Sequence, residues 1–95
     1  MNYETIFIVH PDATQEQQDE ILKEVKGILS EKKTAVLSEQ NWGKKTLAYE
    51  IKKNKEGFYY YVKFSSLVSD IPNKLSLFYR RSEPVLKFLT LRLDD

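Results

Sequence analysis

The segment Trp42–Phe64, WGKKTLAYEIKKNKEGFYYYVKF, has the pattern of two β-strands joined by a turn, and the predicted fold is arranged around this hairpin. Residues 42–64 hold six Lys against two Glu and four of the six tyrosines, whereas residues 1–41 hold four Lys against eight Asp and Glu. Basic charge that is gathered among aromatic rings indicates a surface that meets phosphate, stacked bases or another protein.

Strand and helix patterns alternate before and within the hairpin. The β-type residues 3–9 precede a helix that starts at a capping box formed by Thr14 and Gln17 and is expected to run to about Lys33. Residues 35–51 then read as one long strand with a bulge near Gly43. We expect residues 54–57 to turn the chain and residues 58–64 to form the returning strand.

A second helix and a last strand complete the pattern after the hairpin. Ser69-Asp70 caps the helix, Ser82-Glu83-Pro84 ends it, and residues 85–92 form the strand. The order βαββαβ implies two right-handed crossovers and one hairpin. We therefore expect an α+β ferredoxin-like sandwich, a four-stranded antiparallel sheet with two helices on one face, formed by a single domain over residues 1–95.

Composition narrows the class of protein further. The chain has no Cys, which excludes disulfides and thiolate metal sites, and its one His offers no ligand cluster. No apolar run is long enough to cross a membrane, and the N-terminus lacks the pattern of a signal peptide. The sequence therefore predicts a cytoplasmic protein that meets no membrane and uses no cofactor, metal ion or small-molecule substrate.

The strands are apolar on both faces, although one face of this sheet should be bare and polar. In the first strand Ile6 and Ile8 point away from Phe7, which we place in the core. An uncovered apolar face marks a partner or ligand surface. The alternative is that edge loops or the C-terminal residues fold over it. The fourth strand has the same pattern, with Leu86 and Phe88 against Leu89 and Leu91, and its orientation stays open.

Several segments together resemble one family. Gly43–Lys52, GKKTLAYEIK, looks like its signature, and Tyr3-Glu4, His10-Pro11, Phe58-Tyr59 and the segment 79–87 also match. On these residues the chain resembles, over nearly its whole length, the bacterial ribosomal protein S-six family, the sixth numbered protein of the small subunit. Two residues depart from the family pattern, which more often has a longer polar or basic residue at Thr46 and an aliphatic one at Arg81.

The resemblance implies a structural, non-enzymatic constituent of the small ribosomal subunit. It implies binding to the central domain of 16S rRNA together with a small basic partner, ribosomal protein S-eighteen, as a heterodimer. The rRNA-binding residues under this hypothesis are Lys44, Lys45, Lys52, Lys53, Arg80, Lys87 and Arg92. The interface with the partner protein would consist of Ile6, Ile8, Tyr59, Tyr61 and Lys63.

Two other functions fit parts of the pattern. An RRM-like module has the same element order and would stack single-stranded RNA on Tyr59 and Tyr61, but it requires Phe7 on the open face and Ile6 and Ile8 buried. A small ferredoxin-like hydrolase would need an arginine or glycine in the loop after the first strand. That loop, residues 10–14, has neither, and a histidine beside a proline is more typical of a turn than of a general base.

The charged residues also have purely structural interpretations. Lysines on the hairpin can keep an exposed edge strand from pairing with other chains. Arg80 and Arg81 can stabilise the C-terminal end of a helix. Trp42, beside the bulge, is expected to pack rather than to stack on a base. The first helix is acidic on its outer face through Glu16, Glu20, Glu24 and Glu31, and it should point away from RNA.

Overall fold

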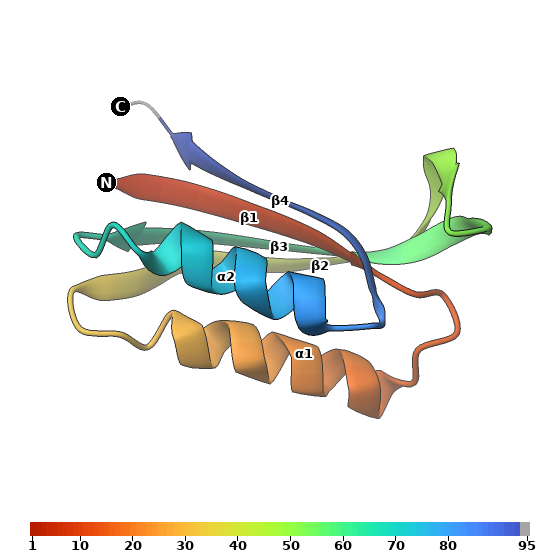
Figure 1. Cartoon of the computed structure of the whole chain (residues 1–95), viewed down its shortest axis with the longest axis horizontal. Helices are drawn as coiled ribbons and strands as arrows, with labels where there is room; N and C mark the ends of the chain where they lie inside the picture. Colours follow the sequence, from red (N-terminus) through yellow and green to blue (C-terminus); the bar gives the residue numbers. More distant parts are fainter. Residues whose placement is uncertain (94–95) are drawn as a thin grey trace.

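Two helices cover one face of a four-stranded antiparallel sheet in the computed structural model, which describes residues 1–93 (Figure 1). The strands lie in the order β2-β3-β1-β4. The βαββαβ order and the ferredoxin-like arrangement confirm the predicted fold; residues 94 and 95 of the predicted domain lie outside the described part of the chain. The elements are β1 (Asn2–Val9), α1 (Gln15–Ile28), β2 (Thr34–Ile51), β3 (Asn54–Ser66), α2 (Ile71–Arg81) and β4 (Val85–Leu93).

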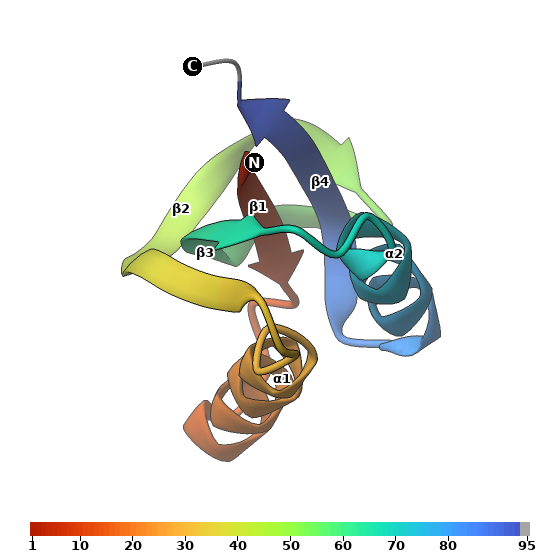
Figure 2. The same ribbon diagram turned by 90° about the vertical axis from the view of Figure 1, so that its left-hand side faces the viewer.

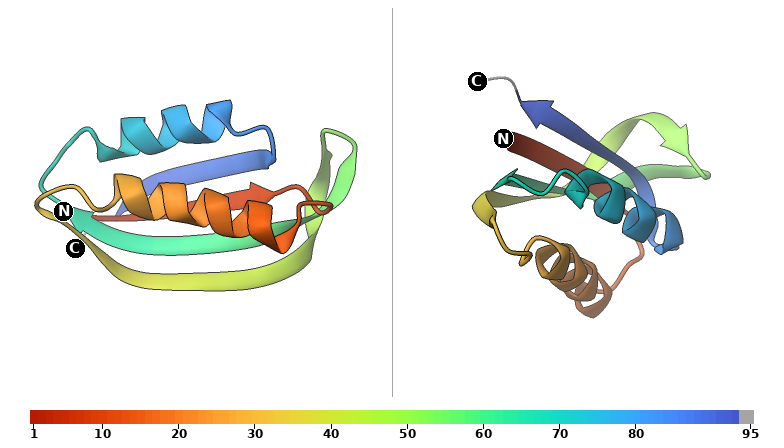
Figure 3. Two further views of the ribbon diagram at one scale, coloured as in Figure 1. Left: turned by 90° about the horizontal axis from the view of Figure 1, so that it is seen from below. Right: turned by 60° about the vertical axis from the view of Figure 1, so that its left-hand side comes forward.

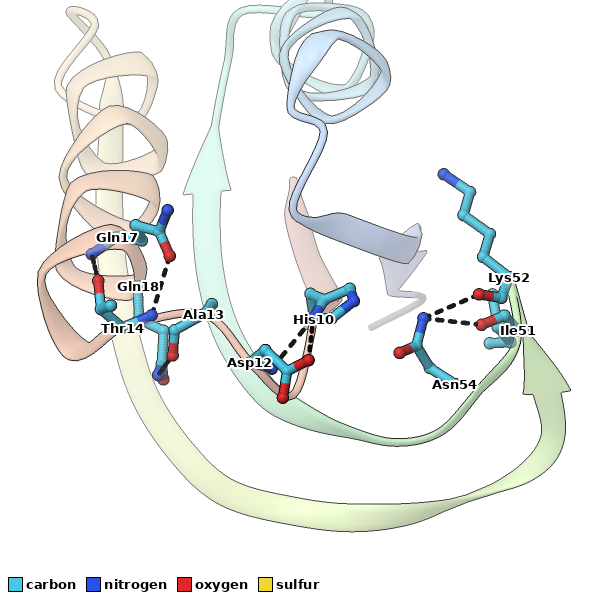
Figure 4. A network of polar contacts seen from close by, with 9 residues as sticks. All are labelled: His10, Asp12, Ala13, Thr14, Gln17, Gln18, Ile51, Lys52 and Asn54. Atoms are coloured by element: carbon cyan, nitrogen blue, oxygen red, sulfur yellow. Dashed lines mark hydrogen bonds and ion pairs between the residues drawn. The ribbon is translucent and has the colours of Figure 1, made fainter.

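Helix α1 begins at the predicted capping box. The backbone N–H of Gln17 donates to Thr14 Oγ1 at 3.1 Å, and the N–H of Thr14 donates to Gln17 Oε1 at 2.9 Å (Figure 4). The helix ends at Ile28, so its predicted extension to about Lys33 was wrong. Leu29 is the buried C-cap, and the left-handed Lys33, with φ of 64°, leads the chain into β2.

Helix α2 runs antiparallel to α1 in the same layer (Figure 3). Asp70 occupies its N-cap position, but the Asp70 side chain makes no capping hydrogen bond. Pro72 lies in the first turn, where a missing N–H costs nothing. Ser82 ends the helix as predicted, and its N–H donates to the carbonyl groups of Phe78 and Tyr79.

The hairpin turns at Lys52 and Lys53, two residues before the predicted turn. Both have positive φ, 48° and 67°, as a two-residue turn that matches the twist of its strands requires. Asn54 Nδ2 donates to the carbonyls of Ile51, at 3.3 Å, and Lys52, at 3.0 Å, so the Asn side chain supports the turn from outside it. The predicted turn at residues 54–57 was therefore wrong, because these residues open β3.

Three irregularities interrupt the pairing of β2 with β3, and the first skips Leu37, since Val36 pairs with Phe64 and Ser38 with Lys63. The predicted bulge is present: Asn41 pairs with Tyr60 and Gly43 with Tyr59, and Gly43 adopts φ of 77°. Closer to the turn, residues 47–50 lie opposite Lys55 alone, since Thr46 pairs with Glu56 and Ile51 with Asn54. The end of the hairpin consequently bends away from the plane of the sheet (Figure 1).

The main core lies between the sheet and the helices. Phe7 is fully buried there, with its ring centroid 5.2 Å from that of Tyr60 and 5.3 Å from that of Tyr79. The Tyr79 hydroxyl shares a 2.9 Å hydrogen bond with Thr5 Oγ1, and burial raises the pKa of the phenol, which stays neutral. Phe88, the register partner of Phe7, also stacks on Tyr79, with their ring centroids 5.0 Å apart. This contact places the Phe88 side chain on the helix side of the sheet and settles the orientation of β4.

Gly57 lies where β1 leaves no room for a side chain on β3. A Cβ at this position would lie 2.5 Å from Ile8 Cγ2 and 3.1 Å from the Val9 carbonyl oxygen. We predict that Gly57→Ala lowers the free energy of unfolding by roughly 1–3 kcal/mol, the usual effect of overpacking, when measured by denaturant titration. Gly27→Ala is the matched control, because nothing lies within 4 Å of its added Cβ. That control should leave stability unchanged or raise it by up to about 1 kcal/mol, and an equal loss in both variants would contradict the prediction.

Candidate protein and nucleic-acid interface

The face of the sheet opposite the helices, called the open face below, carries apolar side chains from three strands. Ile6 pairs with Tyr61 on one side and with Leu89 on the other, so all three project to this face. Leu89 is 50% exposed and Leu91 is 43% exposed. Figure 2 shows both helices on the other side of the sheet, which leaves these side chains uncovered.

Trp42 lies over the tyrosines of the open face. Its ring centroid is 5.4 Å from that of Tyr61 and 6.4 Å from that of Tyr59, and its Nε1 donates to Gln40 Oε1 at 2.7 Å. Trp42 is the extra residue of the bulge before Gly43, and the bulge directs its side chain to this face. Trp42 was not among the predicted site residues. The predicted bulge could have indicated it, because a bulge changes the face to which a neighbouring side chain projects.

Polar residues border the open face near the start of β1. Tyr61 donates from its hydroxyl to Glu4 Oε2 at 3.0 Å, and Lys63 is the register partner of Glu4. Partial burial, followed by the hydrogen bond and the charge of Glu4, raises the pKa of the Tyr61 phenol. Tyr61 is therefore a neutral hydrogen-bond donor whose ring is held flat against Trp42. Tyr59, Tyr61 and Lys63 all lie on the open face with half-buried side chains.

One end of the open face is covered by the bent hairpin. Ile8 is only 7% exposed, because it packs with Leu47 and Leu86 in a second small core. The alternative, that other parts of the chain fold over the apolar face, therefore holds only at this end, and the rest of the face is uncovered as expected. Of the predicted interface residues, Ile8 offers little surface to a partner. Ile6, beside it, lines a shallow hollow together with Tyr59, Lys87 and Leu89.

The two adjacent lysines of the signature segment, Lys44 and Lys45, lie on opposite sides of the hairpin. Lys44 Nζ is 5.2 Å from the ring centroid of Phe58, which packs against the main core on the helix side. Lys45 Nζ is 5.6 Å from the ring centroid of Trp42, on the open face. A single phosphate group therefore cannot be held by both side chains in the way that their adjacency in the sequence suggests.

The remaining predicted rRNA-binding residues form one group and one outlier. Lys52 lines a hollow with Arg80 and Arg81, between the hairpin tip and the connection from α2 to β4, and Lys53 is the next residue of the turn. Lys87 projects from β4 at the same end of the molecule, opposite Ile8 in register. Arg92, in contrast, pairs with Tyr3 at the far end of β4, near the termini. Arg81 joins the group although it was not a predicted site residue.

An RRM-like module would require Phe7 on the open face, and the structure does not place it there. Phe7 is fully buried, and the accessible aromatic rings on the open face are those of Tyr59, Tyr61 and Trp42.

His10 has a structural role, since its Nδ1 accepts a 3.0 Å hydrogen bond from the N–H of Asp12 and closes the turn after β1 (Figure 4). Residues 1–93 contain no group of three His, Cys, Asp or Glu side chains that could hold a metal ion.

Neither helix in the described part of the chain is long and apolar enough to cross a membrane.

The family model for ribosomal protein S6 matches residues 2–92. The chain belongs to the ribosomal protein S6 family. The small ribosomal subunit protein bS6 of Bacteroides fragilis is 42% identical over 92 residues, which cover 97% of this chain and 80% of the relative. The bS6 protein of Caldanaerobacter subterraneus is 33% identical over 94 residues, which cover 99% and 98% of the two chains.

A solved structure agrees with this family and with its fold. The crystal structure of 30S ribosomal protein S6 from Thermotoga maritima matches with a TM-score of 0.87 and 30% sequence identity, over 97% of this chain and 86% of that chain. Ribosomal protein S6 is a structural protein family and not an enzyme family. Its members are constituents of the small ribosomal subunit, which in bacteria lies in the cytoplasm. The resemblance noted from the signature segment is thereby confirmed.

The contact between Glu4 and Tyr61 can be tested by titration. We predict that Glu4→Gln lowers the pKa of the Tyr61 phenol toward its ordinary value, because the charge that opposes tyrosinate formation is removed while burial remains. The measurement is an NMR titration of the tyrosine ring signals at alkaline pH. Glu56→Gln, an exposed change on the same hairpin, should leave the Tyr61 pKa where it is. A Tyr61 pKa that does not move in Glu4→Gln would contradict the role of Glu4.

Proposed function

We propose that this chain is a structural constituent of the small ribosomal subunit that binds the central domain of 16S rRNA together with ribosomal protein S-eighteen. Membership of the ribosomal protein S6 family supports the assembly as a whole. The main structural support for a protein partner is the uncovered open face. The basic residues around that face and at the hairpin tip would make the contacts with RNA.

The open face has the composition of a protein interface. Aromatic rings lie at its centre, Leu89 and Leu91 lie half-exposed along β4, and Lys63 and Lys87 stand at its margins. Interfaces are enriched in aromatic residues at the core and polar at the rim, and burying apolar area contributes about 25 cal/mol per Å². A partner seated on Ile6, Tyr59, Tyr61 and Leu89 would remove this surface from water. Ile8 would support these side chains from beneath.

The lysines divide the RNA contact into two parts. Lys45 and Lys87 lie on the open-face side, so they would hold phosphates next to the bound partner. Lys52, Lys53 and Arg80 would hold phosphates at the hairpin tip. Phosphate contacts position a protein on folded RNA without reading sequence, and the partner and the RNA shape would supply the specificity. Lys44, on the helix side, and Arg92, at the far end of β4, would reach separate parts of the RNA.

The first experiment compares RNA binding with and without the partner. We expect weak binding of the chain alone to a central-domain fragment of 16S rRNA and strong binding when ribosomal protein S-eighteen is present. Leu89→Asp should weaken the heterodimer at least roughly thirtyfold, the loss that marks a hot-spot residue, because it would place a carboxylate beneath the partner. Leu77→Asp is the matched control, because Leu77 is 52% exposed and lies on α2, away from the open face. Calorimetry measures the heterodimer, and filter binding measures the RNA complex.

Two outcomes would contradict this proposal. Equal loss of the heterodimer in Leu89→Asp and Leu77→Asp would remove the open face as the site of the partner. Tight binding to short single strands without the partner would instead indicate direct base stacking on the tyrosines. Circular dichroism of both variants verifies that the sandwich is folded before either result is interpreted.

The salt dependence of RNA binding tests the lysines individually. Each lost phosphate contact should flatten the slope of log K against log salt concentration by about 0.7 to 0.9. We predict this change for Lys45→Ala and for Lys44→Ala, each measured with the partner present. Lys23→Ala, an exposed lysine of α1, should keep the full slope. An unchanged slope for Lys44 or Lys45 would assign that lysine to the solvated surface.

A further inference from the structure

Helix α1 carries a row of carboxylates that the proposed function does not use. Glu16, Glu20 and Glu24 are spaced by four residues and exposed, so neighbouring like charges face each other on one side of the helix and destabilise it. Within residues 1–93, none of the three forms an ion pair. Two lysines of the helices form ion pairs with carboxylates outside this row: Lys26 binds Glu39 at 2.9 Å, and Lys74 binds Glu31 at 2.8 Å.

This row borders a groove between the two helices. The helices run antiparallel, so the first half of α1 lies beside the end of α2 (Figure 3). The groove has an apolar lining of Ile21, Phe78 and Pro84, and Glu20 and Glu24 project along its α1 side. Phe78 and Pro84 are only half-buried, which leaves apolar surface accessible at the bottom of an acidic channel.

The groove continues into a second hollow at the end of the sandwich where β1 meets α1. The two share Gln17 and Pro84, and the second adds Asp12 and Glu83 to the lining. Neither lining contains a Lys or Arg side chain. Four carboxylates thus surround one continuous surface whose interior is apolar, and the only other titratable group on it is His10, which is engaged in the turn.

We propose that this α1–α2 groove binds a basic peptide segment of a partner protein, with one apolar side chain of the segment seated on Phe78, Ile21 and Pro84. Charge complementarity selects this occupant: Lys or Arg residues on either side of the apolar anchor would meet Glu20 and Glu24 at one end and Asp12 and Glu83 at the other. Glu20, Glu24 and Asp12 repel phosphate, which disfavours RNA in the groove. Glu83 lies at the boundary, because it also lines the hollow of Lys52, Arg80 and Arg81. The site lies in the helix layer, on the opposite side of the molecule from the open face, and it does not depend on the proposed function.

The test is an NMR titration of the whole chain with a short peptide of Lys and Arg that has a single central Leu. We expect amide shifts to concentrate at Ile21, Glu24, Phe78 and Ser82. Glu20→Gln combined with Glu24→Gln should weaken binding by roughly two- to thirtyfold, the range that two exposed ion pairs supply. Glu50→Gln combined with Glu56→Gln removes the same charge from the exposed hairpin and should have a smaller effect.

A second peptide with Gly in place of Leu separates the groove from charge alone. It should bind to the unchanged chain more weakly than the Leu peptide does, because without Leu the apolar lining of the groove stays exposed to water. The Glu20 and Glu24 double variant should unfold at the same or a higher temperature, since it loses a like-charge repulsion. Equal affinity for the two peptides, or equal weakening by both double variants, would overturn the proposal, as would amide shifts that concentrate outside the groove.

Discussion

The packing of Phe7 between Tyr60 and Tyr79 is the contact on which the rest of the structure depends. It decides which face of β1 meets the helices, and a shift of one residue would turn Phe7 to water and Ile6 inward. The Thr5 hydroxyl reinforces this register, because it hydrogen-bonds both Tyr79 OH, at 2.9 Å, and Thr90 Oγ1, at 3.0 Å. A single buried hydroxyl therefore connects β1 to α2 and to β4. The register of β1 also orients β3 and β4, the two strands that pair with it.

The hairpin depends on this register but adds its own departures from a regular ladder. An extra residue before Gly43 turns the Trp42 side chain onto the tyrosines, and the wide irregularity near the turn brings Leu47 onto Ile8. The first departure leaves an aromatic platform accessible, and the second closes the other end of the same face. The accessible part of the open face is therefore limited at one end by the chain itself, which defines where a partner can be seated.

Local patterns in the sequence predicted most of the fold, and tertiary contacts explain what they missed. The capping box at Thr14, the bulge at Gly43 and the orientation of Phe7 could be predicted because each follows from the pattern of neighbouring residues in the sequence. The orientation of β4 was not, because a register shift opposite Ile8 and Val9 places Leu86 next to the hairpin instead of in strict alternation. The turn was misplaced because Asn54 and Gly57, typical turn residues, serve as a side-chain brace and a packing gap. Adjacency of Lys44 and Lys45 likewise concealed their separation onto two faces.

The position of Trp42 has a spectroscopic consequence. It is the one tryptophan of the chain, so indole fluorescence excited selectively comes from the open face alone. Trp42 is 39% exposed in the folded chain, and its ring is stacked on Tyr61 and hydrogen-bonded through Nε1. Unfolding increases the contact of this ring with water, whereas a partner that covers the platform decreases it. The two processes therefore move the emission in opposite directions, and the protein has a native optical probe on the surface that it would use for assembly.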